Sequence, residues 1–470
     1  MTRRIAMTLL LCAVAAPAHA QITSVKLPAY TKKTLANGAT LILLEKPDVP
    51  LVSVRALFKG GMEAESADQA GINSLTAELA RRGTRTRTAE QFNEQIDALG
   101  ATLTGGANRQ YSYLATEFLS STEDKALELF ADALANPAFP EDEFKKALAQ
   151  RIDQARSGKD NPSQAIAGYY PSFFFGNGYP YGHPSSGDEA TLAKMTRASV
   201  MAWHKKMFGA RNLILIAAGD LKTDAMAAKL EKIASALPAG EAYQWRKQTA
   251  PPQYKSARLL LIDKPDATQT YFRIVSPGIH RTHPDRVPLE IVNTLFGGRF
   301  TSMLNDELRV NSGLTYGAGS AVEQDRLTGA IFINTYSQTK TTVAAIDLAL
   351  AVLKRLREKG IDAEMLQSAK NYIKGGFPTR ELETADQVAG ILGELEIFDL
   401  NKSEVDDYFS RIDAVTLEKA NETARKWYTA DNLQFLLVGN ASAIEAQVKK
   451  YAPSMKVVSI KEPGFSAPAF

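Results

Sequence analysis

Two stretches of similar sequence decide the fold: ASVMAWHKKMFGARNLILIAAGD at residues 198–220 and EKANETARKWYTADNLQFLLVGN at residues 418–440. Each is typical of a helix followed by a short apolar strand. Asn212 and Asn432 are 220 positions apart, and the same offset relates the glycines that end the two strands. A second matching pair, PEDEFKKALAQRI and DAEMLQSAKNYI, lies upstream in the same order. Several matches in one order indicate an internal duplication.

The duplication predicts an α+β protein with two homologous domains in tandem. In each half, strand-like runs precede several helices and a closing strand, which favours a mixed or antiparallel sheet covered by helices. We place the domains at residues 21–240 and 257–470, joined by a linker at residues 241–256 within a stretch rich in Pro, Lys and Gln. A cleft between two such domains is a favoured place for a ligand.

Residues 1–20 have the pattern of a cleavable signal peptide. Arg3 and Arg4 precede a short apolar run, and an Ala-His-Ala cleavage site ends at Ala20. The run is shorter than the roughly 20 residues of a membrane-spanning helix, so we expect an exported protein. Cys12 is the only cysteine and lies in this segment, so the mature chain is expected to have no disulfide. A twin-arginine signal and a lipid on Cys12 are weaker alternatives.

The composition is that of a globular protein and excludes some function classes. Hydrophobic residues make up 45% and charged residues 23%, which argues against disorder. The formal net charge of +3 gives no support for a nucleic-acid-binding surface. The sequence contains no P-loop, no G-x-G-x-x-G and no G-x-S-x-G motif.

The stretch FGGRFTSMLNDELRVNSGLTYGAGS at residues 296–320 predicts a helix, a glycine stop and an emerging strand. Helical spacing predicts one buried stripe, formed by Phe300, Met303, Leu304 and Leu308. Arg309 follows Phe300 by nine positions and should therefore point away from that stripe.

Arg309 and Tyr316, on the two sides of the glycine stop, can offer hydrogen-bond donors to one cleft. The simpler alternative is that Arg309 pairs with Asp306 on a solvated helix face, which contributes little to stability. In that case Tyr316 is a half-buried strand residue. The stretch by itself leaves both interpretations open.

A second helix is predicted over residues 71–84, GINSLTAELARRGT, with three large aliphatic side chains on its buried face. Ser74, Ala77 and Glu78 share the opposite face, at the spacing with which a helix holds a metal and a base. Zinc requires at least three imidazole, thiolate or carboxylate ligands from the protein. These three residues cannot supply them.

Four histidines follow the signal peptide, and none has a histidine partner four positions away. His204 is best explained by helix packing. His183 is interpreted as a hydrogen-bonding residue of an aromatic loop predicted at residues 169–187. His280 and His283 lie three positions apart in a proline-bounded loop, which leaves a metal site there as an alternative.

Taken together, the chain resembles the insulinase/pitrilysin family of inverted-motif zinc peptidases, in a short bacterial form akin to subunits of mitochondrial processing peptidase. The resemblance covers residues 28–450. It rests on NGATLILLEKPDVPLVSV, GINSLTAELARRGT, YPYGHPSSGDEATLAKMT, ARNLILIAAGD and the stretch at residues 296–320. It implies that the chain forms one half of a clamshell.

The resemblance also implies that the zinc motif is lost. The family carries H-x-x-E-H on a helix and a third ligand, a glutamate, on a later helix. Here the first histidine becomes Ser74, the glutamate base becomes Ala77 and the second histidine becomes Glu78. The third ligand falls near Arg151, to within a residue. We therefore expect no metal in this chain and no cleavage of peptides by it alone.

The family's second catalytic element is retained. Members carry an Arg and a Tyr, seven positions apart, that hold the scissile carbonyl, and here they match Arg309 and Tyr316. We expect a periplasmic heterodimer in which a homologous partner supplies zinc and this chain supplies the pair, acting on unfolded peptides. The alternatives are an inert peptide-binding or scaffold subunit of the same fold, and an enzyme with an unrelated site at His280 and His283.

Overall fold

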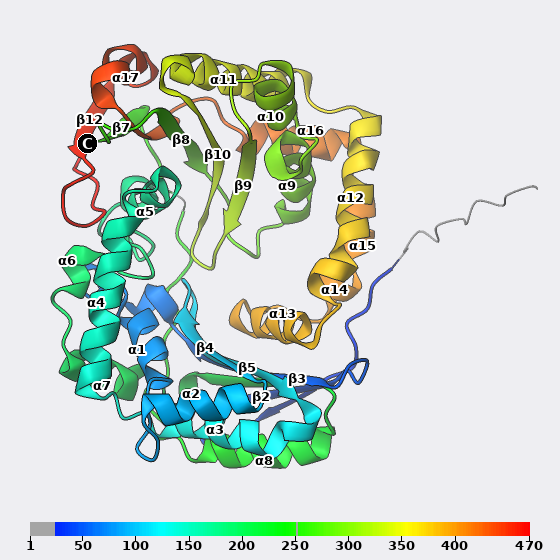
Figure 1. Ribbon diagram of the computed structural model, residues 1–470. Coiled ribbons are helices and arrows are strands. Elements are labelled where there is room, and N and C mark those ends of the chain that lie inside the picture. The colour runs from blue at the N-terminus through cyan, green and yellow to red at the C-terminus, as the bar shows by residue number, and fades with distance from the viewer. Residues whose placement is uncertain (1–23, 251) are drawn as a thin grey trace, which may run out of the picture.

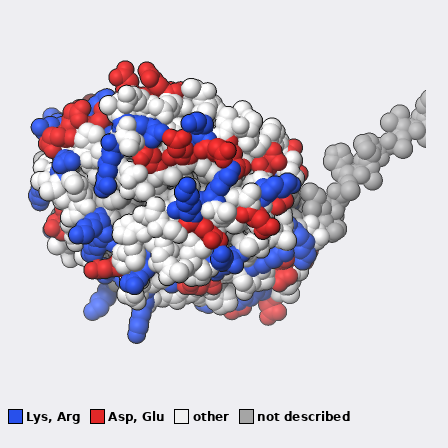
Figure 2. All heavy atoms as spheres, turned by 90° about the horizontal axis from the view of Figure 1, so that it is seen from below, with Lys and Arg blue, Asp and Glu red and all other residues white. Residues whose placement is uncertain are grey.

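The computed structural model describes residues 24–250 and 252–470, which form two domains with one six-stranded sheet each (Figure 1). The predicted signal peptide lies outside these residues. Within them, no helix has the length and apolar character needed to cross a membrane. Acidic and basic side chains are interspersed on the face shown in Figure 2, in keeping with the small net charge.

The N-terminal sheet is mixed, with strand order β1-β2-β6-β3-β5-β4, because β6 runs parallel to β2 and antiparallel to β3. Its strands are β1 (Thr31–Thr34), β2 (Thr40–Glu45), β3 (Leu51–Lys59), β4 (Thr102–Ala107), β5 (Tyr111–Leu119) and β6 (Leu213–Gly219). The helices of this half are α1 (Ile72–Ala80), α2 (Ala89–Ala98), α3 (Glu123–Ala135), α4 (Glu141–Gly158), α5 (Pro162–Phe175), α6 (Glu189–Leu192), α7 (Arg197–Met207) and α8 (Thr223–Ser235).

The C-terminal sheet repeats this arrangement, with strand order β12-β7-β11-β8-β10-β9. Its strands are β7 (Arg258–Asp263), β8 (Gln269–Pro277), β9 (Ala318–Gln324), β10 (Gly329–Gln338), β11 (Gln434–Gly439) and β12 (Ser454–Ser459). The helices of this half are α9 (Arg286–Asn293), α10 (Met303–Asn305), α11 (Thr342–Lys359), α12 (Ala363–Glu381), α13 (Ala385–Ile397), α14 (Ser403–Asp406), α15 (Tyr408–Asp413), α16 (Leu417–Trp427) and α17 (Ala441–Val448).

The predicted α+β class and the two tandem homologous domains are confirmed. The closing strand of each half lies between the two strands that open that half. β6 runs parallel to β2 and antiparallel to β3, and β11 runs parallel to β7 and antiparallel to β8. The edge strands differ: β1 precedes β2 and is antiparallel to it, whereas β12 comes from the end of the chain and runs parallel to β7.

The two domains exchange one helix each (Figure 1). Helix α5 of the N-terminal half packs on β8 and β11, and α13 of the C-terminal half packs on β3 and β6. Because α13 covers the face of the sheet that faces away from α8, every residue of β6 is buried. Burial on both faces explains why β6 is a continuous apolar run and does not alternate with polar residues. The aromatic loop predicted at residues 169–187 is wrong in its first part, which belongs to α5.

An ion pair fixes α13 to the N-terminal sheet. Arg55 on β3 donates from Nε to Asp386 Oδ1 over 3.1 Å and from Nη2 to Asp386 Oδ2 over 2.6 Å. Ser53 donates to the same carboxylate over 2.9 Å. A bidentate pair of this kind specifies orientation as well as attraction, so it orients α13 on β3.

Two glycines of α13 test how closely this helix packs. A Cβ on Gly393 would lie 2.7 Å from Leu57 Cδ1, whereas a Cβ on Gly390 would lie 3.6 Å from its nearest neighbour, a guanidinium nitrogen of Arg55. We expect Gly393→Ala to lower the free energy of unfolding by about 1–3 kcal/mol through overpacking. Gly390→Ala should raise it by up to about 1 kcal/mol, because alanine favours a helix. Urea unfolding measures both, and equal effects would contradict the close contact at Gly393.

Candidate functional site

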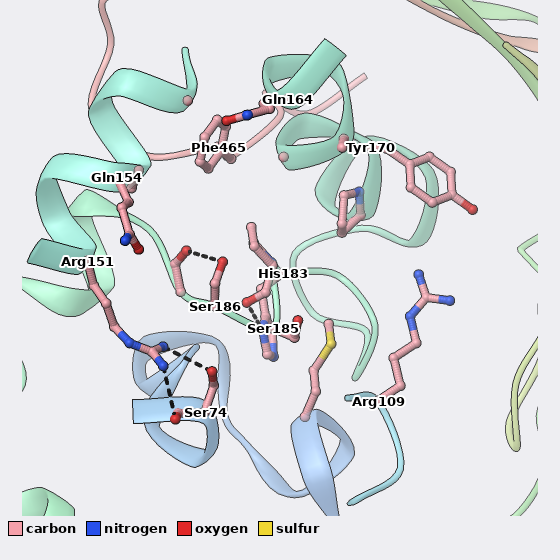
Figure 3. Close-up of a pocket in the computed structure, with 18 of the residues that line it drawn as sticks. Ser74, Arg109, Arg151, Gln154, Gln164, Tyr170, His183, Ser185, Ser186 and Phe465 are labelled. Carbon is pink, nitrogen blue, oxygen red and sulfur yellow. Dashed lines mark hydrogen bonds between the residues drawn. The ribbon is translucent and has the colours of Figure 1, made fainter. Parts of the chain in front are cut away.

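The positions that the resemblance aligns with the three zinc ligands converge between α1 and α4 (Figure 3). Arg151 donates from Nη1 to Ser74 Oγ and from Nη2 to the Ser74 carbonyl oxygen, both over 3.0 Å. Its Nε donates to Glu78 Oε2 over 2.7 Å, and Arg82 binds the other carboxylate oxygen. We call Ser74, Glu78 and Arg151 the Arg151 cluster. In it, a guanidinium links the two helices at the positions that the resemblance aligns with zinc ligands.

The residues present do not fit zinc. Ser74 and Glu78 already accept hydrogen bonds from a permanent cation, Arg151, which lies near the position that the resemblance aligns with the third ligand. Ala77 has no ligand atom and is fully buried, because β4 passes over it so closely that a Cβ on Gly105 would lie 2.3 Å from its carbonyl oxygen. In residues 24–250 and 252–470, no group of three His, Cys, Asp or Glu residues could hold a metal ion.

The electrostatics of the Arg151 cluster favour its ion pair. Burial by itself would raise the pKa of the Glu78 carboxyl, but Arg151 and Arg82 outweigh it and hold that pKa below its ordinary value. A lowered carboxyl pKa stabilises the folded state above the ordinary carboxyl range, and this stabilisation is lost as the pH falls through the folded-state pKa.

Removing the Arg151 guanidinium should therefore weaken the fold. We expect Arg151→Met to lower the free energy of unfolding by about 2 kcal/mol near pH 7, because a largely buried carboxylate loses a charged partner. Arg156→Met on the same helix is the matched control, since that side chain is 66% exposed. Urea unfolding of the double variant Arg151→Met/Glu78→Gln should show a smaller loss than Arg151→Met alone. Equal losses for the two arginine variants would contradict this role.

Arg309 and Tyr316 lie on the C-terminal domain, outside the cavity that the Arg151 cluster borders. Arg309 belongs to a π-helical turn, Asp306–Asn311, that continues α10. Tyr316 lies in the loop before β9 and is 79% exposed, so it is not the half-buried strand residue of the simpler alternative. Among the ion pairs of the described residues, none joins Arg309 to Asp306. Instead, the guanidinium carbon of Arg309 lies 4.7 Å from the centroid of the Phe300 ring.

The predicted buried stripe is correct only in part. Leu304 and Leu308 are fully buried, and Met303 is half-buried. Phe300, in contrast, is 64% exposed, because the helix begins only at Met303 after its cap residue Ser302. The prediction that Arg309 points away from Phe300 is therefore wrong. Phe300 lies outside the helix, and the wide π turn shifts the phase on which that prediction was based.

Asn305 holds the segments on both sides of Arg309 together. Its Nδ2 donates to the Phe300 carbonyl oxygen over 2.7 Å, and its Oδ1 accepts from the Ala318 backbone N–H over 3.3 Å. The backbone N–H of Leu314 donates to the Leu308 carbonyl over 2.9 Å, which folds the loop before Tyr316 back on the helix. These hydrogen bonds thus support the half-buried Arg309 and the exposed Tyr316.

A cavity of about 640 Å³ adjoins the Arg151 cluster, and sequence reasoning did not identify it. We call it the inter-domain cavity, because α1, α4, α5 and the loop at residues 183–187 meet β8 and β9 there. His183 lines it, with Nδ1 3.4 Å from the Pro184 carbonyl oxygen, as a loop residue that forms hydrogen bonds. Arg109, Arg273 and Glu323 also line it. The sequence carries no spacing signal for these residues, since they come from separate strands and turns.

The histidine alternative finds no support in the geometry. The rings of His280 and His283 lie 5.5 Å apart, but His283 Nδ1 accepts the Asp285 backbone N–H and its ring packs edge-on against Trp427. Lys426 and Lys419 bind the Asp285 carboxylate. His204 packs between the rings of Phe139 and Phe208, as predicted.

Comparison with known families decides the relationship. Residues 40–172 match the family described as Insulinase (Peptidase family M16), and residues 194–373 match the Peptidase M16 inactive domain. The chain belongs to the insulinase family. The two matches together support an inactive-type subunit of this family.

Relatives of this insulinase-family chain span almost its whole length. An uncharacterized zinc protease of Mycobacterium leprae is 26% identical over 403 residues, 84% of this chain and 88% of the relative. A non-peptidase homolog of Helicobacter pylori is 22% identical over 425 residues, 90% and 94% of the two chains.

Solved structures share the fold of this insulinase-family chain. A peptidase M16 inactive domain from Pseudomonas fluorescens superimposes with a TM-score of 0.81 at 24% identity, over 87% of this chain and 98% of that one. A chain of complex III2 from Candida albicans does so with a TM-score of 0.73 at 17% identity, over 88% and 97%. At these identities the likeness establishes the fold alone.

Proposed function

We propose that this chain is the non-zinc subunit of an exported heterodimeric metallopeptidase that cleaves unfolded peptides. The observation that carries the proposal is a contrast between two sites. At the Arg151 cluster an arginine side chain links Ser74 and Glu78, which supports a chain that supplies no metal. At the second site, Tyr316 is exposed, and Arg309 is supported by Phe300 but joined to no carboxylate among the described residues.

In the proposed enzyme, Arg309 and Tyr316 donate hydrogen bonds to the carbonyl oxygen of the substrate as negative charge develops on it. A guanidinium stays charged at any pH at which the protein is folded. Stacking against the Phe300 ring leaves its N–H groups, which lie in the guanidinium plane, free to donate. Donors placed in advance of the reaction contribute more than flexible ones, since they need not reorganise as charge forms.

The proposed partner is a homologous subunit with an intact H-x-x-E-H motif. Arg309 and Tyr316 do not line the cavity next to the Arg151 cluster, so within this chain they have no metal site to serve. A second chain would supply the zinc and the base, which act on a water molecule. The expected compartment is the periplasm, on the basis of the N-terminal signal pattern.

A mixing experiment tests the proposal. The mature chain and a zinc-bearing homologue from the same organism are purified separately, and cleavage of an unstructured fluorogenic peptide is measured for each alone and for the mixture. We expect cleavage by the mixture and less than about 1% of that rate for either chain alone, since each lacks part of the site. Cleavage by this chain alone, or stoichiometric zinc in it, would show that the proposal is wrong.

The second candidate function is an inert peptide-binding subunit, and the inter-domain cavity favours it. In that case the partner alone would cleave the peptide as fast as the mixture does. The mixing experiment therefore separates the two functions directly.

A further inference from the structure

The turn that carries Tyr316 lies beyond the end of a strand ladder. The ladder between β9 and β10 ends at the pair Ala318–Thr335, so Thr315, Tyr316 and Gly317 lie outside it. The Tyr316 side chain is 79% exposed. An exposed side chain on a turn without ladder hydrogen bonds keeps one position only if other groups hold the turn.

Thr335, on β10, holds this turn through its side chain. Its hydroxyl donates to the Gly317 carbonyl oxygen over 2.9 Å. Its Oγ1 also lies 3.3 Å from Thr315 Oγ1, which accepts the Gly317 backbone N–H over 3.2 Å. Thr335 and Thr315 are both buried, with exposed fractions of 6% and 7%. Buried hydroxyl groups therefore hold the residues on both sides of Tyr316.

The same turn is joined to the helix that carries Arg309. The backbone N–H groups of Leu314 and Thr315 both donate to the Leu308 carbonyl oxygen, over 2.9 and 3.3 Å. Leu308 is fully buried and directly precedes Arg309. Thr315 thus has one contact with the helix and another with β10. Arg309 belongs to the helix, whereas Tyr316 depends on both contacts.

The N-terminal half contains an equivalent threonine without such a turn. Thr335 and Thr116 each lie four positions before a 3-10 helix, Thr339–Thr341 or Ser120–Thr122. Their strands also have equivalent places, since β5 lies between β3 and β4 as β10 lies between β8 and β9. Thr116 Oγ1 is buried and has no hydrogen-bond partner in the part of the chain that the structure describes. Among the described residues, the hydroxyl group at this position therefore forms hydrogen bonds only in the half that carries Tyr316.

We propose that Thr335 is a positioning residue that holds Tyr316 where its hydroxyl can donate to the substrate carbonyl oxygen. This rests on the proposed function of Arg309 and Tyr316. Thr335 is too deeply buried to meet the substrate itself. A donor that is held in place stabilises developing charge better than a mobile one, because it need not be ordered during the reaction. Thr335 therefore contributes to kcat through Tyr316 and not through Arg309.

Steady-state kinetics of the mixed enzyme test this proposal. Thr335→Val replaces the hydroxyl group by a methyl group of similar size. We expect it to lower kcat about five- to tenfold and to leave KM unchanged, because the hydrogen bond of Tyr316 forms mainly in the transition state. Thr335→Ser keeps a hydroxyl group and should retain most of the activity. The matched control is Thr116→Val, which removes the unpartnered hydroxyl group of the other half and should leave kcat unchanged.

Two backgrounds separate the positioning of Tyr316 from a general effect on the fold. In the Tyr316→Phe background, Thr335→Val should have no further effect on kcat, because the hydroxyl group that it positions is absent. In the Arg309→Lys background, which retains a cation, Thr335→Val should still lower kcat about five- to tenfold. A merely structural role would give the same loss in both backgrounds.

Hydrogen exchange of the mature chain alone provides a measurement that needs no partner. Mass spectrometry of peptides that span residues 314–318 follows the exchange of the turn. We expect Thr335→Val to speed this exchange about tenfold or more, whereas Thr116→Val should leave it unchanged. Circular dichroism first establishes that each variant is folded. If Thr335→Val does not fold, Thr315→Val, which removes the other hydroxyl group of the pair, takes its place with the same expected results.

The failure of this proposal differs from the failure of the proposed function. If the mixture does not cleave the peptide, or if Arg309→Ala and Tyr316→Phe leave its activity unchanged, the proposed function is wrong and the role of Thr335 is overturned with it. If those two variants lower kcat, only the role of Thr335 is in question. It is overturned by an unchanged kcat of Thr335→Val, by equal losses in the two backgrounds, or by unchanged exchange of the turn.

Discussion

Replacing Ser74 and Glu78 by histidine and Arg151 by glutamate should turn this chain into a zinc-binding protein. The three positions already converge, since one guanidinium contacts both Ser74 and Glu78. Two imidazoles and a carboxylate form a common protein zinc site, so we expect about one zinc ion per chain in the triple variant. The wild-type chain should hold none after dialysis against a weak chelator. Plasma mass spectrometry of the dialysed proteins measures the difference.

The control for this experiment keeps Arg151. In the double variant Ser74→His/Glu78→His, the guanidinium still lies between the two imidazoles, and its charge repels a metal cation. We therefore expect no stoichiometric zinc in the double variant. If the double variant binds zinc as tightly as the triple variant, Arg151 does not occupy the metal position. The triple variant should not cleave peptides, because Ala77 supplies no base.

Arg309→Ala should reduce kcat of the mixed enzyme by about 10²–10³-fold, the usual effect of removing one oxyanion donor. KM should change little, because the interaction forms mainly as charge develops in the transition state. Tyr316→Phe, which removes only the hydroxyl group, should act in the same direction. Steady-state kinetics of the reconstituted heterodimer with one unstructured peptide provide the measurement.

Two further variants sharpen this result. Arg299→Ala is the matched control, because Arg299 lies near Arg309 in sequence but binds Ser368 and stacks on Tyr372. It should leave kcat unchanged. Phe300→Leu should lower kcat less than Arg309→Ala does, because it removes the ring that orients the guanidinium but leaves the charge. Unchanged activity of Arg309→Ala would refute the shared site and favour the inert peptide-binding subunit.

The chain order of the elements could be predicted from the sequence because it depends on local patterns. The repeated helix–strand unit at residues 198–220 and 418–440 became α7 with β6 and α16 with β11, which have equivalent places in the two sheets. The expected loss of the zinc motif also rests on residue types, since Ser74 is no usual zinc ligand and Ala77, at the position of the base, has no side-chain oxygen.

Side-chain partners could not be predicted in this way. The helical spacing assigned Phe300 to the core, but the helix begins at Met303 and the Phe300 ring instead supports Arg309. Helical periodicity shows that a helix has an apolar face, but it does not show which surface covers that face. The sequence therefore did not predict that α5 and α13 pack on the sheet of the other domain. The inter-domain cavity follows from that exchange.

For this protein, the sequence by itself determined the duplication, the α+β class and the family resemblance. These properties depend on residue types, on short spacings and on the order in which similar segments recur along the chain. Only the tertiary structure decided that Arg151 links Ser74 to Glu78 and that Arg273 and His183 share one cavity. Arg151 lies 77 and 73 positions from Ser74 and Glu78, and Arg273 lies 90 positions from His183. Long-range packing, which leaves no periodic trace in the sequence, brings these residues together.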